Sequence, residues 1–336
     1  FSLIEITKKN VKKVSDDVWK KYFDMRIQFD ERPGSKTPFL DHKQLKEIMT
    51  DRFEKDKNFI SINIILKDED FHGFVAFASV PNSPRKKYLQ VFYNSVHLDS
   101  DKEIISIISK QTKKYYRKKR DGLILFVTDN NKFANIAKKL KGKVGEYDIR
   151  MTLPPKDANK KLMRKWLKEV PIQNPDIRLE FYTELPDELI VEYSALFTKF
   201  MKDMPGPHYY NTYVDPKKIK EGQVRSKENN SGSYRYLAFN KKNKMIGMTN
   251  IFIAKDHPQY PYQYMTGTLK EYRQRGIGKW MKAANFFKIT KDFPRKIREI
   301  VTETSPDNFG SKRTSKLLGF KYQGCEVFYE LDIDKL

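Results

Sequence analysis

The feature of this 336-residue sequence that most restricts its fold is an order of secondary-structure elements that is predicted twice. In each half, the hydrophobic periodicity predicts a strand, two helices and three strands, and then a helix, a strand, a helix and closing strands. Successive strands followed by a crossover helix are typical of a mixed sheet. We therefore expect an α+β fold of two tandem domains, each a twisted, mostly antiparallel sheet flanked by helices.

Prolines mark the boundary between the two halves. Pro154 and Pro155 cannot donate hydrogen bonds to a β-ladder and therefore end a strand. A basic amphipathic helix follows, and then Pro171 and Pro175. The expected organisation is an N-terminal domain over residues 1–155, a linker helix and proline-containing linker over 156–176, and a C-terminal domain over 177–336.

Composition excludes several classes of protein. A hydrophobic share of 39% with 13% aromatic residues is enough to build cores, so wholesale disorder is excluded. The longest apolar runs, such as residues 59–66, are much shorter than the roughly 18 to 20 residues of a membrane-spanning helix. The first residues do not resemble a secretory signal, and Cys325 is the single cysteine. We expect a cytoplasmic protein without a membrane span or a disulfide.

The chain is strongly basic, with 66 Lys and Arg residues against 43 Asp and Glu residues and a formal net charge of +23. Such a charge attracts polyanions, which include nucleic acid, membrane surfaces and phosphorylated cofactors. The basic residues recur beside acidic ones on predicted helices, as in residues 157–169, and are not gathered in one tail. The pattern fits either a solvated lysine-rich surface or a functional basic groove.

A glycine turn carries the sharpest signal for a binding site. It lies between a predicted strand and a predicted helix and reads Tyr-Arg-Gln-Arg-Gly-Ile-Gly-Lys over residues 272–279. The N-terminus of a helix presents free N–H groups and the positive end of its dipole to an anion, and glycine lets the backbone approach a ligand. Arg273, Arg275 and Lys279 add positive charge. These residues by themselves predict a phosphate-binding loop, with an ordinary basic turn as the alternative.

The spacing Arg273-x-x-Gly276-x-Gly278 resembles the Q/R-x-x-G-x-G/A loop of the GNAT superfamily of N-acetyltransferases. The resemblance extends to Thr266–Leu269 at the family's splayed fourth strand, Ile300–Glu303 at its fifth, Asp307-Asn308, and Leu318–Phe320 at the end of its last helix. It implies acetyl-CoA as co-substrate. The cofactor-binding residues that it implies are Thr266, Gly267, Thr268, Arg273, Gln274, Arg275, Gly276, Ile277, Gly278, Lys279 and Asn308.

Within the superfamily, the sequence most resembles the mycothiol-synthase-like branch, whose members are also tandem. The features that carry this resemblance are the Thr-Gly pair before the loop, the helix that contains Lys282, and Asp203-Met204-Pro205 after a long helix. In the first half, Leu98-Asp99-Ser100-Asp101 stands where the glycine loop is expected. Two carboxylates cap a helix well but repel a pyrophosphate. We therefore expect a degenerate first domain and a cofactor site in the second.

The resemblance also implies candidate catalytic groups. The backbone N–H near Thr268 corresponds to the donor that the family offers to the thioester carbonyl. Glu303 is the candidate base, because several members carry a catalytic glutamate at this distance from the residue matching Asn308; an ordinary strand-end carboxylate is the alternative. Ser315 stands where many relatives have an acidic tyrosine, and serine is a much weaker acid.

The thiolate product therefore leaves without help, or is protonated by water or by another tyrosine such as Tyr322 or Tyr329. Beyond Asp203, the aromatic residues Tyr209 and Tyr210 line an acceptor pocket or pack against the sheet. His208 has no metal-ligand spacing with another histidine or with Cys325, so no metal is expected.

The leading hypothesis is an acetyl-CoA-dependent N-acetyltransferase whose partners are acetyl-CoA and a small amine. One alternative is an aminoacyl transferase that uses charged tRNA on a related tandem fold. The net charge of +23 suits this alternative, but such an enzyme does not need the loop at 273–278, so a nucleic-acid partner is less favoured. The other alternative is a non-catalytic acyl-CoA sensor, which the missing tyrosine would fit.

Overall fold

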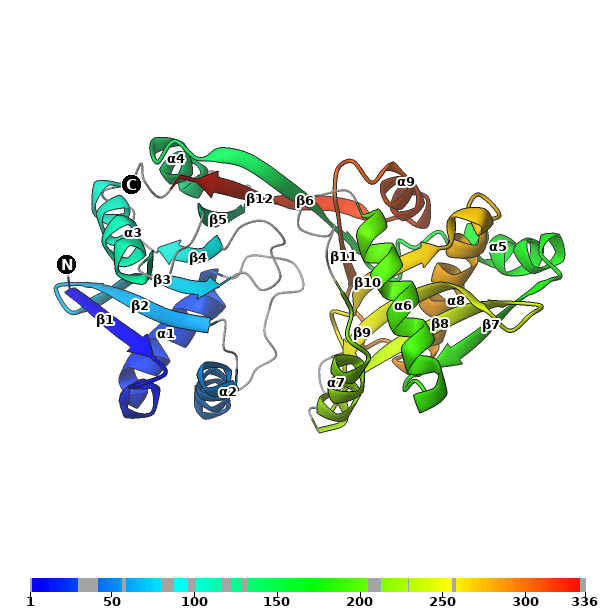
Figure 1. The fold of residues 1–336 in the computed structure, drawn as a ribbon, viewed down its shortest axis with the longest axis horizontal. Coiled ribbons are helices and arrows are strands. Elements are labelled where there is room, and N and C mark those ends of the chain that lie inside the picture. The colour runs from blue at the N-terminus through cyan, green and yellow to red at the C-terminus, as the bar shows by residue number, and fades with distance from the viewer. Residues whose placement is uncertain are drawn as a thin grey trace. The chain divides into compact units, whose positions relative to one another are not determined.

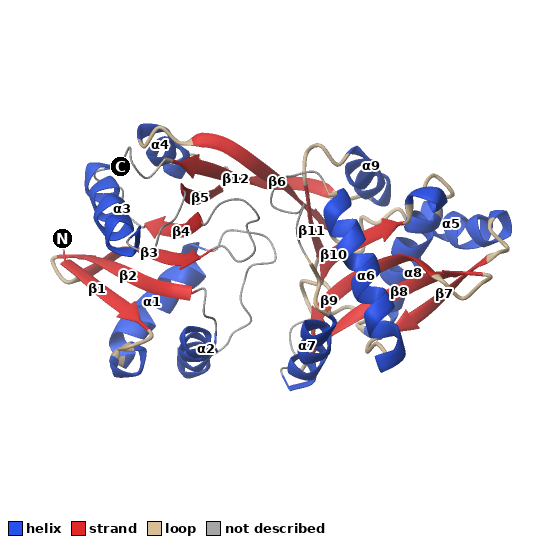
Figure 2. Cartoon of the chain, in the orientation of Figure 1, coloured by secondary structure: helices blue, strands red, loops and turns tan. Residues whose placement is uncertain are grey.

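A computed structural model describes most of the chain. The described residues are 2–29, 42–55, 59–79, 88–95, 101–116, 122–128, 132–204, 213–228, 230–255 and 258–332. The chain forms two compact units, the first made of Phe1–Tyr147 and Gly324–Leu336 and the second of Asp148–Gln323. Each unit combines a mixed sheet with helices on its faces (Figure 1 and Figure 2), which confirms the predicted α+β class.

The sheet of the first unit has the strand order β1-β2-β3-β4-β5-β12. Neighbouring strands pair antiparallel except for β4 and β5, which are parallel. The strands are β1 (Ser2–Thr7), β2 (Phe59–Lys67), β3 (Asp70–Ser79), β4 (Tyr88–Ser95), β5 (Gly122–Thr128) and β12 (Lys321–Leu331). The helices are α1 (Asp16–Phe29), α2 (His42–Lys55), α3 (Asp101–Tyr116) and α4 (Lys132–Lys139), with a short 3-10 helix, η1 (Val11–Lys13).

Side-chain alternation along β3 divides the core of the first unit between the two faces of the sheet. Phe74 and Ala76 pack with α1 and α2, where Trp19 stacks on Phe23 with ring centroids 5.4 Å apart. Val75 and Phe77 point to the other face, which buries residues of α3 and α4. Alternating apolar residues therefore build both cores.

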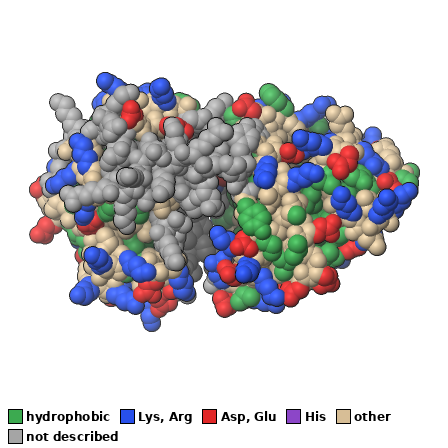
Figure 3. Space-filling view, in the orientation of Figure 1, with side chains coloured by type: hydrophobic (Ala, Val, Ile, Leu, Met, Phe, Trp, Pro, Cys, Tyr) green, Lys and Arg blue, Asp and Glu red, His purple; other side chains and the backbone are tan. Residues whose placement is uncertain are grey.

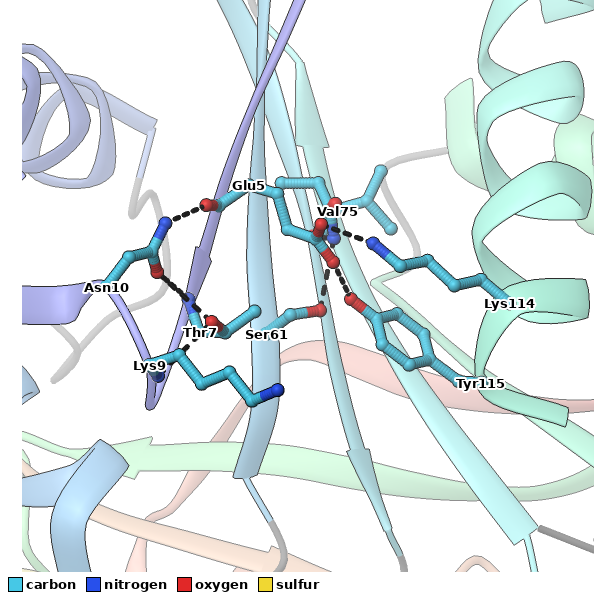
Figure 4. Close-up of polar contacts among 9 residues, drawn as sticks. Glu5, Thr7, Lys9, Asn10, Ser61, Val75, Lys114 and Tyr115 are labelled. Carbon is cyan, nitrogen blue, oxygen red and sulfur yellow. Dashed lines mark hydrogen bonds and ion pairs between the residues drawn. The ribbon is translucent and has the colours of Figure 1, made fainter. Parts of the chain in front are cut away.

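A polar network fixes α3 to the edge strand β1 (Figure 4). The Glu5 carboxylate accepts hydrogen bonds from the Lys114 ammonium and the Tyr115 hydroxyl on α3. Burial acts to raise the pKa of the Glu5 carboxyl, but these two donors outweigh it and hold the pKa below its ordinary value. Beside them, the Asn63 amide donates to the Ser61 hydroxyl and to the Val75 carbonyl.

The sheet of the second unit has the strand order β6-β11-β10-β9-β8-β7. The pair β10 and β11 is parallel, and the others are antiparallel. The strands are β6 (Lys143–Leu153), β7 (Ile177–Tyr182), β8 (Ser231–Asn240), β9 (Met245–Ala254), β10 (Tyr262–Thr268) and β11 (Ile300–Thr304). The helices are α5 (Lys160–Gln173), α6 (Asp187–Asp203), α7 (Pro216–Glu228), α8 (Ile277–Asp292) and α9 (Phe309–Leu318), with a 3-10 helix, η2 (Lys270–Tyr272).

Helices cover both faces of this second sheet. Helices α5 and α8 contact each other and lie on one face, while α6 and α7 contact each other and lie on the opposite face (Figure 1). Helix α8 is the crossover between the parallel strands β10 and β11, so it runs antiparallel to both. Among the described residues, none of the helices has both the length and the apolar character needed to cross a membrane.

The last strand of each sheet comes from the other half of the sequence. Residues 149–153 of β6 follow the first unit along the chain but pair with β11 of the second unit. Residues 326–331 of β12 follow the second unit but pair with β5 of the first. Tyr329 and Leu331 are buried in the core of the first unit, and Met151 and Leu153 in that of the second. Each half of the sequence therefore needs the other to complete its sheet.

We predict that Leu331→Ala destabilises the first unit although it changes the C-terminal end of the chain. Leu331 is 2% exposed and packs in the core with Ile108 and Ala137. A Leu→Ala change in a core costs about 2 to 5 kcal/mol. Hydrogen exchange should report faster opening of β2 and β3. Leu317→Ala is the control, because Leu317 is 38% exposed. Equal protection of β2 and β3 in the two variants would contradict the prediction.

Candidate functional site

The site begins where β10 and β11 separate. Their parallel pairing joins Tyr262 to Val301 and Gln263 to Thr302. The register of β10 against β9 then shifts between Gln263 and Thr266, which is the mark of a β-bulge. Leu269 donates its backbone N–H to Ile246 of β9. Because backbone groups alternate between the two edges of a strand, the Thr268 N–H points to the open edge.

A cavity of about 870 Å³ occupies this opening, within the range of small-molecule sites. Its walls come from β10, the glycine loop, α8, the end of β11, the start of α9 and the end of α6. Ten of the eleven residues that sequence analysis expects to bind a cofactor line it. They are Thr266, Gly267, Thr268, Arg273, Gln274, Gly276, Ile277, Gly278, Lys279 and Asn308.

The loop leaves the N-terminus of α8 open to a ligand. Gly276 is its N-cap residue, has a φ of 81°, and provides no side-chain hydrogen bond to the first turn. The first N–H groups of the helix are therefore available to an anion. A Cβ atom at Gly276 would lie 3.1 Å from Val170 in addition to the strain of a positive φ. Glycine is thus required at this turn.

A second close approach fixes Gly267. A Cβ atom built on it would lie 2.7 Å from the ring of Phe200 on α6. Beside it, the hydroxyls of Thr266 and Thr249 are 2.7 Å apart and the Gln263 amide donates to the Asn250 carbonyl. These contacts set the floor of the cavity along β10.

The loop arginines lie in different surroundings. The Arg273 guanidinium donates to the Asp203 carboxylate over 2.6 Å and lines the cavity. Arg275 donates instead to Asn174 over 2.7 Å and to Asp176 over 2.8 Å, and it does not line the cavity. The structure therefore differs from the expectation that Arg275 adds charge at the cofactor: these contacts fasten the loop to the segment after α5.

Glu303 lies between two partners that sequence analysis did not identify. Its carboxylate pairs with the Arg150 guanidinium at 2.9 Å and accepts a hydrogen bond from the Tyr262 hydroxyl at 2.8 Å. Burial, together with the nearby Glu303 charge, raises the pKa of Tyr262 above its ordinary value. Arg150 stands opposite Glu303 in the register of β6 with β11, so the pair depends on the exchanged strand.

None of the other side chains expected to supply a proton lines the cavity, and the acceptor-loop tyrosines lie outside the described residues. Ser315 on α9 is fully buried, does not line the cavity, and its hydroxyl has no partner among the described residues. Tyr329 belongs to the first unit and Tyr322 is 59% exposed. The tyrosines that line the cavity are Tyr262, Tyr264 and Tyr272. Those expected at the acceptor loop, Tyr209 and Tyr210, lie outside the described residues, as do His208 and residues 98–100.

The cavity wall also contains Lys282, for which the sequence resemblance implies no role. This lysine on α8 is 7% exposed, and burial lowers its pKa to about 8. The signal in the sequence was its spacing of four residues from Gly278, which places both on one face of the helix. No cluster of three or more His, Cys, Asp or Glu residues in the described part of the chain could hold a metal ion.

The surface charge is mixed where it can be seen. Figure 3 shows Lys and Arg side chains interspersed with Asp and Glu on the visible face of the described residues. Several form exposed ion pairs, such as Lys220 with Asp187 and Lys227 with Glu184. Exposed pairs contribute little to stability. This arrangement fits a solvated lysine-rich surface.

Solved structures share this fold along the whole chain. A tandem GNAT protein from the clavulanic acid biosynthesis pathway has a TM-score of 0.72 and 16% identity, over 99% of this chain and 98% of that one. A GCN5-related N-acetyltransferase from Sphaerobacter thermophilus has a TM-score of 0.61 and 12% identity, over 98% and 96%. A GNAT-family acetyltransferase from Colwellia psychrerythraea has a TM-score of 0.56 and 12% identity, over 99% and 100%.

Sequence comparison alone does not reach these proteins. No family model matches the chain, and no curated protein matches it. The likeness therefore rests on structure, together with the loop and the strand separation that the sequence resemblance predicted. The chain has the fold of the tandem GNAT acetyltransferases.

Proposed function

We propose that this protein transfers an acetyl group from acetyl-CoA to the amine of a small molecule, and that the active site lies in the second unit. The observation that carries this proposal is the cavity, which joins the uncapped N-terminus of α8 to the open edge of β10. The helix end suits a pyrophosphate. The open strand edge suits an extended chain with amide groups, as in pantetheine. The fold likeness to acetyltransferases supports the same assignment.

The residues present fit this co-substrate. Gly276 and Gly278 leave room beside the first N–H groups of α8, and Lys279 lines the same end of the cavity with a positive charge. Arg273 would reach the phosphates after exchanging its contact with Asp203. Thr266, Gly267 and Thr268 offer the strand edge to the pantetheine arm, and Asn308, the N-cap of α9, lines the same cavity. Arg275 has a different part, because it holds the loop in place.

The acyl transfer itself requires a neutral amine, a polarised thioester carbonyl and a base. The Thr268 N–H, which points to the open edge of β10, is our candidate donor to the carbonyl oxygen. Glu303 is our candidate base, acting directly or through a water, with Arg150 and Tyr262 holding the orientation of its carboxylate. The amine nitrogen forms the new amide bond, the carbon–sulfur bond breaks, and the acceptor proton leaves to the base.

The acceptor is proposed to enter from the side of the cavity where Glu303, Tyr262 and Tyr264 lie. Tyr264 is 53% exposed and makes an edge-on contact with Phe197 of α6. Asp203 borders the same cavity at the end of α6, and Tyr209 and Tyr210 follow it in the sequence. We assign Ser315 no part in proton transfer, because it lies outside the cavity wall.

We predict that acetyl-CoA binds one site per chain and that Gly276→Glu abolishes binding. The glutamate would be strained at a positive φ and would put a negative charge beside the phosphates. Calorimetry should give a stoichiometry of one. At a ligand concentration about 100 times the dissociation constant, the protein should be stabilised by about 2.7 kcal/mol. Gly222→Ala is the matched control, because a Cβ there meets no atom within 4 Å. A stoichiometry of two would contradict a degenerate first unit.

The salt dependence of binding distinguishes an acetyltransferase from an aminoacyl transferase that uses charged tRNA. A tRNA partner would bind with a steep linear fall of log affinity against log salt, because many phosphate contacts release counterions. Acetyl-CoA, with few phosphates, should show a shallow dependence. Tight tRNA binding with a steep slope, and no acetyl-CoA binding, would favour the aminoacyl transferase instead.

We predict that Glu303→Gln lowers turnover about 10²- to 10⁴-fold while acetyl-CoA binding changes little. The rate should recover as the pH rises toward the pKa of the acceptor amine, because the amine then arrives neutral. A lysine-like amine, with a pKa near 10.4, needs the base most. The measurement is thiol release from acetyl-CoA over a panel of small amines.

Two variants serve as controls in this assay. Glu299→Gln removes a carboxylate just before β11 that does not line the cavity, and it should leave turnover unchanged. Ser315→Ala should also change turnover little. Normal turnover of Glu303→Gln at neutral pH would refute the base assignment. A loss in Ser315→Ala as large as that expected for Glu303→Gln would refute the assignment of no role to the serine.

A further inference from the structure

Lys282 is a buried cation in the wall of the cavity that no contact of the protein explains. It lies on α8, is 7% exposed and lines the cavity. Among the described residues, none makes a hydrogen bond or ion pair with its amine. A buried amine without a protein partner is costly, so its place in a cavity wall calls for a catalytic role or a partner inside the cavity.

The neighbouring polar groups on the strands already have partners of their own. The hydroxyls of Thr249 and Thr266 bond to each other, and the Thr302 hydroxyl donates to the Gln263 carbonyl. The Glu303 carboxylate is held by Arg150 and Tyr262, as described above. No described residue therefore serves as an acceptor for the Lys282 amine, which opens on the cavity and is free to donate to water or to a bound molecule there.

The position of Lys282 along α8 indicates which part of that molecule it meets. A Cβ atom on Gly278 would be 3.8 Å from Thr266, so the helix and β10 touch at this level. Lys282 is four residues further along, which is about 6 Å of helix rise and about two residues of an antiparallel strand. Its Cα is thus level with the bulge between Gln263 and Thr266, and helical side chains lean back toward the N-terminus. Lys282 therefore leaves the helix at a deeper level of the cavity than the phosphate-binding loop, and its side chain reaches back toward the level of Thr266.

The reacting end of the co-substrate belongs at this depth. Glu303, the candidate base, directly follows Thr302, and Thr302 pairs with Gln263 at the start of the bulge. Side chains alternate along β11, so Glu303 borders the opening from one face of the sheet and Lys282 on α8 borders it from the other. A thioester that lies in the opening between the strands is therefore within reach of both. We propose that the Lys282 ammonium donates a hydrogen bond to the thioester carbonyl oxygen of bound acetyl-CoA. This inference rests on the proposed function and names a second donor beside the Thr268 N–H.

The chemistry of this contact favours the transfer. When the amine of the acceptor attacks the carbonyl carbon, negative charge develops on the carbonyl oxygen before the carbon–sulfur bond breaks. A cation that donates to this oxygen stabilises the developing charge more than it stabilises the neutral thioester. Lys282 donates a hydrogen bond throughout and keeps its proton, so the proton balance of the reaction is unchanged.

The low pKa of Lys282 in the free protein makes the contact measurable. Burial lowers it to about 8, so about half of the amine is neutral at pH 8. A hydrogen bond to an acceptor favours the charged form and raises the pKa, so binding takes up a proton. The charged residues that share the cavity wall are Asp148, Lys202, Asp203, Arg273, Lys279, Glu303 and Asp307, together with the tyrosines Tyr262, Tyr264 and Tyr272.

The experiment compares acetyl-CoA with S-ethyl-CoA, a thioether that lacks only the carbonyl oxygen. Calorimetry at pH 8 in two buffers of different ionisation enthalpy gives the protons taken up. We predict an uptake of about half a proton per chain with acetyl-CoA, and no uptake or a release of protons with the thioether, which covers the amine without accepting its hydrogen bond. The affinity for acetyl-CoA, but not for the thioether, should fall as the pH rises above about 8. Loss of one charge-assisted hydrogen bond in Lys282→Met should weaken acetyl-CoA about tenfold.

Variants make the outcome specific to this residue. Lys282→Met should abolish the proton uptake. Lys282→Gln is a second variant for the case that the first does not fold. Lys279→Met is the matched control: it should weaken both ligands yet keep the proton uptake. Equal uptake with both ligands, release of protons in place of uptake with acetyl-CoA, or uptake that persists in Lys282→Met would each overturn the inference. Absence of binding by either ligand would overturn the proposed function itself.

Discussion

The separation of β10 from β11 is the constraint on which the second unit depends. A continuous ladder would bond every backbone group and leave no interior space. Here two residue pairs hold the strands together, and the bulge after Gln263 then directs β10 away from its parallel neighbour. Side chains from both faces of the sheet enter the opening: Phe200 from α6 approaches Gly267 so closely that a Cβ atom would not fit, and Lys282 enters from α8. The cavity is thus a property of the sheet, and the loop at its end is only one wall of it.

The exchange of final strands makes this site depend on a segment that follows the first unit in the chain. Residues 149–153 of β6 complete the second sheet and bring Arg150 opposite Glu303. Two nitrogen atoms of Arg150 are buried and find no hydrogen-bond partner in the described part of the chain, so the guanidinium is held there at some cost. The pair is only partly buried, so it adds little to stability, but it does fix the orientation of the Glu303 carboxylate. We interpret Arg150 as a residue that positions Glu303, so the second unit needs the strand that precedes it in the chain to hold its candidate base.

The sequence predicted the features that local rules govern. The order of elements follows from hydrophobic periodicity. The glycine loop follows from the free N–H groups at a helix N-terminus. Ten of the eleven expected cofactor residues line one cavity. What it could not predict depends on pairings that are distant in the chain. The Arg275 side chain is turned away by Asn174 and Asp176, about 100 residues earlier. The Arg150 contact requires the exchanged strand, and the burial of Ser315 and Lys282 depends on how α8 and α9 pack.

Lys282 shows how a binding site can be recognised from what its ligand must provide. An amine taken out of water loses hydration free energy. Burial accounts for the lowered pKa of Lys282, so no carboxylate of the described residues offsets that loss. Replacing it by a hydrophobic residue of similar size would stabilise the free protein by the same reasoning. Lys282 destabilises the protein without a ligand, yet it faces the place where negative charge develops during the reaction. Its contribution is therefore to stabilise the transition state. The same argument sets the direction of proton exchange on binding. A ligand that only covered the Lys282 amine would expel its proton, whereas a ligand with an oxygen acceptor favours the protonated amine.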